Sequence, residues 1–140
     1  MPLNPFAVRK ASAVLERNVV AVIVGYFTAV ILVLLSFGIL MKISPELFPD
    51  LSAEEEPGVS ILIITLVLGL LFAVVGGYIA AVIARGNEMK IGVALGLIMI
   101  VLGILTMFME EGVKPLWWHG TSLVLLVPCT VLGASLRKKK

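Results

Sequence analysis

His119, the only histidine of the chain, is the residue whose type best suits cofactor chemistry. An imidazole in a membrane protein can serve as an axial ligand of haem or a chlorophyll, or as a proton-carrying group. A haem held by two histidines would take the second one from another chain. His119 also directly follows Trp117 and Trp118, and such aromatic residues are typical of the membrane–water interface. We favour an interfacial histidine without a ligand, and keep His119 as the one candidate cofactor-binding residue.

The acidic and sulfur-containing residues offer little more chemistry. The groups Glu54–Glu56 and Glu110–Glu111 would suit a cation such as calcium if they met in space, but solvated loop charges are far commoner. The single cysteine, Cys129, excludes an intrachain disulfide framework and a cysteine metal cluster. The sequence lacks a glycine-rich phosphate loop, a nucleophile elbow and a histidine pair with metal-ligand spacing. We therefore predict no catalytic residue, no metal, no bound cofactor and no enzymatic activity.

The composition indicates a protein whose solvent is lipid. Of the 140 residues, 60% are hydrophobic and 14% are charged, and the mean hydropathy is +1.13. Soluble domains are about 45–50% apolar and about 25% charged. The net charge of +2 is small, and the tryptophans are not interleaved with the basic residues, so nothing predicts nucleic-acid binding.

Four hydrophobic segments, none with an Asp, Glu, Lys or Arg, are long enough to cross a membrane. They cover residues 19–41, 59–84, 91–109 and 119–136. Even the shortest is about 27 Å long as a helix, close to a hydrocarbon core of about 30 Å. Because backbone polar groups must be satisfied internally in lipid, we predict an all-α integral membrane four-helix bundle, up-down-up-down, as a single transmembrane domain. Outer loops then cover 42–58 and 110–118, an inner loop covers 85–90, and a basic tail covers 137–140.

The basic residues predict the orientation of this bundle. Nine of them lie in the N-terminal segment, the 85–90 loop and the tail, whereas only Lys42 and Lys114 lie on the opposite side. The positive-inside rule then places both termini in the cytoplasm of a multi-pass protein of the cell inner (plasma) membrane. Within the segment 1–18, Asn4 and Pro5 suit the start of a short helix. That helix either lies on the membrane surface or extends the first span.

Small residues recur in the spans at distances that suit helix packing. In the second span they follow one another every four residues, with an adjacent row beside them, and the third span has a similar set. The residues are Gly69, Ala73, Gly76, Gly77, Ala80, Ala81, Gly92, Gly96 and Gly103. Lipid gives helices no hydrophobic drive to associate, and small residues allow the close backbone approach that replaces it. We predict a packing seam of the second span against the third or the first, within the bundle or between protomers, in preference to a bound lipid or pigment.

Pro128 lies inside the fourth span, where it removes one helical hydrogen bond and should kink the helix. Thr130 is near enough in sequence to satisfy some of the freed groups. A kink of this kind can act as a gate, but more commonly it only sets the shape of the helix. We predict that Pro128 sets the shape.

Two motifs of the second and fourth spans stand out. One is a Gly-Gly-Tyr and Ala-rich stretch before a short basic loop, and the other is a Pro-x-Trp-Trp start. They consist of Gly76, Gly77, Tyr78, Ala80, Ala81 and Arg85, and of Pro115, Trp117 and Trp118. In these motifs the chain resembles small uncharacterised four-helix bacterial inner-membrane proteins, over about its last 80 residues. The resemblance implies the four-helix fold and a bacterial inner membrane, and it implies no activity.

Three functions follow as hypotheses. The first is a non-enzymatic structural or accessory subunit of a homo-oligomer or larger membrane complex, with lipid and other membrane subunits as partners. It is favoured by the small-residue seams. It is also favoured because the spans contain no Asp, Glu, Lys or Arg, and ion and proton pathways usually need such residues within the membrane. The alternative is a small oligomeric transporter or channel, favoured by Pro128 and the mid-span hydroxyls. The third is a haem- or pigment-binding subunit that uses His119.

Overall fold

The structure, a computed structural model, describes residues 2–47, 58–110 and 114–138 and is helical throughout its ordered elements. It consists of α1 (Pro5–Ile43), a short 3-10 helix η1 (Pro45–Leu47), α2 (Val59–Ala84), α3 (Glu88–Met109) and α4 (Leu116–Lys138). All four α-helices are long and apolar enough to cross a membrane. The prediction of an all-α chain with four helices that are long and apolar enough to cross a membrane is therefore confirmed for the described residues, and this is the build of a multi-pass membrane protein.

Local chemistry explains where α1 begins and where α2 turns into α3. The Asn4 side chain accepts a hydrogen bond from the Phe6 N–H at 3.0 Å, and Pro5 occupies the first turn, where its missing N–H costs nothing. At the end of α2, Arg85 and Gly86 both have positive φ, 41° and 102°, and reverse the chain. The Glu88 carboxylate then accepts a hydrogen bond from the Gly86 N–H at 2.9 Å, so the turn is short and closed.

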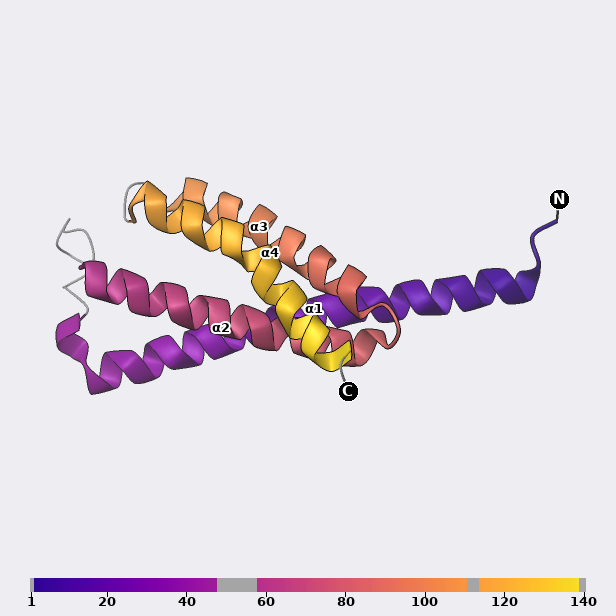
Figure 1. The fold of residues 1–140 in the computed structure, drawn as a ribbon, viewed down its shortest axis with the longest axis horizontal. Coiled ribbons are helices and arrows are strands. Elements are labelled where there is room, and N and C mark those ends of the chain that lie inside the picture. The colour runs from indigo at the N-terminus through magenta and orange to yellow at the C-terminus, as the bar shows by residue number, and fades with distance from the viewer. Residues whose placement is uncertain (1, 48–57, 111–113, 139–140) are drawn as a thin grey trace.

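Consecutive helices run in alternating directions, and α2 lies at the centre of the packing (Figure 1). Its main neighbours are α4 and α1, and α3 packs chiefly on α4. By contrast, α1 and α3 barely meet. The N-terminus, the C-terminus and the α2–α3 turn lie toward the same end of the molecule (Figure 1). This arrangement agrees with the predicted up-down-up-down order of the spans.

The interior is small, and alanines make up most of its hydrophobic core. A cluster of buried residues joins α1, α2 and α3 and consists of Ala21, Ala80, Ala84, Ile91 and Leu95. Large apolar side chains point outward instead, among them Leu34, Val101 and Val124, which are each more than 60% exposed. A surface of this kind is stable only where lipid replaces water, because exposed apolar patches of such extent drive aggregation in water.

The first helix is much longer than a membrane span. At about 1.5 Å per residue its 39 residues measure about 58 Å, roughly twice a hydrocarbon core of about 30 Å. Figure 1 shows its indigo end projecting past the other helices. Of the two alternatives for the segment 1–18, the structure has the extension of the first span and no separate surface helix. We call residues 5–17 the N-terminal arm.

Candidate functional site

The closest helix contacts, which make up the candidate site, begin between α1 and α2 at two glycines. A Cβ built on Gly25 would lie 2.7 Å from the carbonyl oxygen of Gly76, and one built on Gly76 would lie 2.7 Å from that of Gly25. Both glycines are buried, and Ala29 and Ala80 flank them. The two backbones therefore touch directly, and any side chain at either glycine would push the helices apart.

A second direct contact joins α2 to α4. At Gly77 the carbonyl oxygen of Thr130 occupies the space of a Cβ, and at Gly133 the carbonyl oxygen of Val74 does the same. Gly77 is among the predicted packing residues, and Gly133 is not. The sequence signal that could have found Gly133 is the spacing Thr130-x-x-Gly133 beside Ala134, a row of small residues on one helix face.

The glycines of α3 face α4. A Cβ on Gly92 would lie 2.8 Å from the Cβ of Ala134, one on Gly96 would lie 2.6 Å from the Thr130 Oγ1, and one on Gly103 would lie 2.9 Å from the Leu123 Cδ2. These three glycines therefore line a contact between α3 and α4.

The structure thus distributes the small residues over three contacts. We expected α2 to pack on α3 or α1, and its glycine contacts are with α1 and, in addition, with α4. Ala73, Ala80 and Ala81 are buried. Gly69 is different, because no heavy atom outside its own helix surroundings lies within 4 Å of its Cβ position. Gly69 therefore continues the four-residue repeat of α2 in sequence without making a close helix contact.

Pro128 lies inside α4, and the helix changes direction in its middle (Figure 1). Because proline has no N–H, the carbonyl of Val124 loses its helical partner. The Thr130 hydroxyl lies 3.1 Å from the Leu126 oxygen and 3.0 Å from the Val127 oxygen. It therefore bonds carbonyls two and three residues after the freed one, and not the freed one itself. Thr130 and Gly133 follow Pro128 in α4 and lie against α2.

The N-terminal end of α4 is held to α2 by Trp118. Its Nε1–H donates a hydrogen bond to the Leu62 carbonyl at 2.9 Å. The Lys114 ammonium lies 4.7 Å from the centre of the Trp118 ring and 3.0 Å from Glu110 Oε2, so a cation–π contact and an ion pair cover the indole. Trp117, one residue earlier, is 48% exposed and faces outward.

The His119 ring packs against the Trp118 ring. The two rings meet edge to face at 5.2 Å between centroids, and His119 is only 7% exposed. A flat cofactor needs open space beside the ligating nitrogen, and the packing of His119 leaves little space there. Among the described residues no three His, Cys, Asp or Glu side chains are placed to hold a metal ion. Glu54–Glu56 and Glu111 lie outside the described residues.

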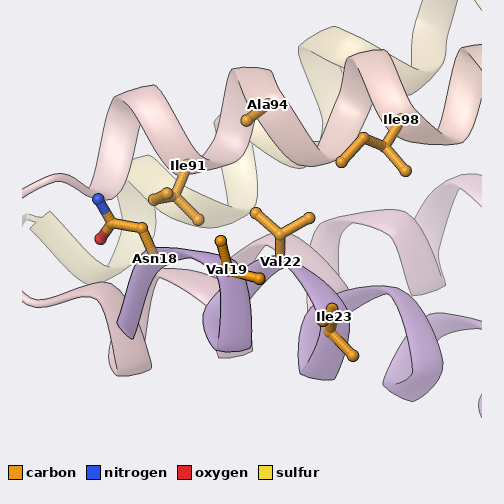
Figure 2. A pocket seen from close by; sticks show the side chains of 7 residues that line it. All are labelled: Asn18, Val19, Val22, Ile23, Ile91, Ala94 and Ile98. Carbon is orange, nitrogen blue, oxygen red and sulfur yellow. The ribbon is translucent and has the colours of Figure 1, made fainter. Parts of the chain in front are cut away.

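An apolar groove with a volume of about 270 Å³ separates α1 from α3 (Figure 2). Its lining residues are Asn18, Val19, Val22, Ile23, Ile91, Ala94 and Ile98. Asn18 is the only polar residue among them, and its buried Oδ1 has no hydrogen-bond partner in the described part of the chain. An unpaired buried acceptor costs roughly 1–3 kcal/mol. The sequence does not reveal this groove, because it arises from the divergence of two helices.

No protein-family model, no curated protein and no solved structure matches this chain. The chain has three contacts at which helix backbones touch, between α1 and α2, α2 and α4, and α3 and α4. Trp118 holds α4 to α2, and an apolar groove lies between α1 and α3 beside the N-terminal arm.

Proposed function

We propose that the chain is a non-enzymatic subunit of a membrane assembly, either a homo-oligomer or a larger complex with other membrane proteins. One observation carries the proposal: the backbones of α1, α2, α3 and α4 touch in the interior, while the groove and the arm of α1 stay open at the periphery. Where the backbones touch, the helices leave no room for a substrate between them. Open apolar surfaces at the periphery suit contact with other subunits and with lipid.

The buried polar side chains support the same view. Among the described residues only His119 and Thr130 are buried and polar, and neither is a carboxylate, a lysine or an arginine. Ion and proton pathways usually place such charged groups inside the membrane.

The proposed setting is the bacterial inner membrane with both termini in the cytoplasm. The support is the charge distribution, because nine basic residues lie on the side of the termini and the 85–90 loop.

Affinity capture from gently solubilised native membranes tests the assembly. We expect other membrane chains, or further copies of this one, to elute in fixed proportion to the tagged protein. Elution of the tagged chain by itself, at tag positions on either terminus, would contradict the proposal.

A small oligomeric transporter or channel is the second candidate, favoured by the bend of α4 at Pro128. Ion flux through proteoliposomes of the purified protein, lost in Pro128→Ala and kept in Gly69→Ala, would support it. Equal, background-level flux in all three proteins would remove it.

A further inference from the structure

The apolar groove between α1 and α3 starts at the level of the α2–α3 turn. Figure 2 shows Asn18 and Ile91 at one end of the groove and Ile98 toward the other. Arg17, the residue before Asn18, donates a hydrogen bond from Nη2 to the Arg85 carbonyl at 3.3 Å, and Arg85 lies in that turn. The end of the groove at Asn18 is therefore at the boundary between the apolar spans and the charged turn.

The groove is too small for a helix of another subunit. Along α3 it runs from Ile91 to Ile98, which is about 10 Å of helix axis and less than half of a hydrocarbon core of about 30 Å. Its volume is about 270 Å³, whereas an α-helix with its side chains is about 10–12 Å across. A single hydrocarbon chain that enters from the membrane surface fits these dimensions and stays within one leaflet.

The walls of the groove suit such a chain. Ile91 belongs to the buried cluster and Val22 packs against it, so these two residues form the inner part of the lining. Val19 and Ile23 are each 50% exposed and Ile98 is 42% exposed, so they form its outer rims. An acyl chain in the groove gains dispersion contacts with both helices and has no polar group to satisfy.

The end of the molecule at which the groove starts is basic. Its basic residues beside the α2–α3 turn are Arg17, Arg85, Lys90, Arg137 and Lys138, and its acidic residues are Glu16 and Glu88. None of these basic residues forms a salt bridge within the described chain, whose one ion pair joins Lys114 and Glu110 at the opposite end. The Glu88 carboxylate accepts its hydrogen bond from Gly86 inside the turn. Cations without an ionic partner at the mouth of an apolar groove favour an anionic head group on an apolar tail.

Two of these cations lie beside the mouth of the groove, one on each helix. Lys90 is exposed and lies one turn before the lining residue Ala94, on the same side of α3. Long side chains of a helix lean toward its N-terminus, which directs Lys90 away from the apolar lining and toward the membrane surface. Arg17 directly precedes Asn18 on α1, and its guanidinium has further N–H donors beside the one that bonds Arg85.

We propose that a phospholipid with an anionic head group binds at this site, with one acyl chain in the α1–α3 groove and its phosphate between Lys90 and Arg17. A phosphodiester carries one negative charge and accepts charge-assisted hydrogen bonds from ammonium and guanidinium groups. Asn18, the only polar residue of the lining, then lies near the ester groups that join the head group to the chains. The inference names a lipid class and holds whether or not the chain assembles with other subunits.

Native mass spectrometry of the purified, delipidated protein tests the head-group part of the inference. The probes are dioleoyl phosphatidylglycerol and dioleoyl phosphatidylcholine, which have the same acyl chains and differ in net charge. We expect one bound phosphatidylglycerol, retained about tenfold more than phosphatidylcholine, because two cations face its phosphate. Lys90→Gln should lower phosphatidylglycerol retention about fivefold. Lys10→Gln, the matched control in the projecting arm, should leave it unchanged.

Substitutions in the groove test the acyl-chain part. Ala94→Phe fills the groove and should lower the retention of both lipids. Val93→Phe adds a ring at the neighbouring position of α3, which is 40% exposed and does not line the groove, and should leave retention unchanged.

Three results would overturn the inference. The first is equal retention of the two lipids by the unmodified protein, and the second is equal retention of phosphatidylglycerol by Lys90→Gln and Lys10→Gln. Neither requires the Ala94→Phe variant to fold. The third is loss of co-eluting membrane chains in Ala94→Phe with phosphatidylglycerol binding unchanged. That result would place a protein partner in the groove and leave the proposed function standing.

Discussion

At Gly77 the position of a side chain is already taken by the backbone of α4. The Thr130 carbonyl oxygen lies where the Cβ of an alanine would be. Gly77→Ala must therefore separate two helices that have no hydrophobic drive to stay together, and overpacking of this kind costs about 1–3 kcal/mol. We expect a lower thermal unfolding midpoint by circular dichroism in a mild detergent.

Gly69→Ala is the matched control in the same helix. No neighbouring atom lies within 4 Å of its Cβ position, so the methyl group meets no contact. Replacing glycine by alanine inside a helix gains up to about 1 kcal/mol. The midpoint should stay constant or rise, and a fall as large as that of Gly77→Ala would show that the α2–α4 contact is not what makes glycine necessary.

Trp117 and Trp118 should respond differently to the same substitution. Trp118→Phe removes the hydrogen bond to the Leu62 carbonyl and should lower the unfolding free energy by about 1 kcal/mol. Trp117→Phe should change it by less than about 0.5 kcal/mol, because this side chain is half exposed and faces outward. Chemical denaturation in detergent measures the unfolding free energy of both variants. Equal losses would contradict the role of Trp118 in holding α4 to α2.

The two tryptophans also show which features of single residues could be predicted from the sequence and which could not. The pattern WWH predicts an interfacial aromatic pair, but not which ring turns inward, since that depends on where α4 starts its first turn. Small residues predict that helices touch, and they do so at Gly76 and Gly77. They do not predict the partner, because a glycine fits any neighbour that approaches closely.

At the scale of elements, the length of α1 is the main result that the sequence left open. Hydropathy separates an apolar span from a charged segment, but helical backbone continues through both, since no residue between Pro5 and Gly25 interrupts it. The other helices begin and end near the predicted spans, because turns at Arg85–Gly86 and prolines mark their limits.

The continuity of α1 predicts a distance. Ser12 and Ser36 lie 24 residues apart in one helix, which corresponds to about 36 Å along its axis. Spin labels on cysteines at these positions, in a Cys129→Ser background reconstituted in lipid, should report a narrow distribution near this value. A distance well below it would mean that the arm bends onto the membrane surface.

At the scale of the whole molecule, charge and apolar surface predict how the chain sits in its membrane. Reporter fusions that are active on only one side should give the cytoplasmic signal at residue 140 and at the 85–90 loop. They should give the opposite signal at the 42–58 loop, because the basic residues gather on the side of the termini. The same signal at all three sites would contradict the alternating topology.

The mass of the assembly extracted from native membranes tests the central claim most directly. Native mass spectrometry after capture in a mild detergent resolves one chain of 15.0 kDa from its complexes. We predict a defined larger mass, equal to several copies or to this chain with other subunits. A dominant signal of 15.0 kDa, with bound lipid as its only addition, would contradict the account.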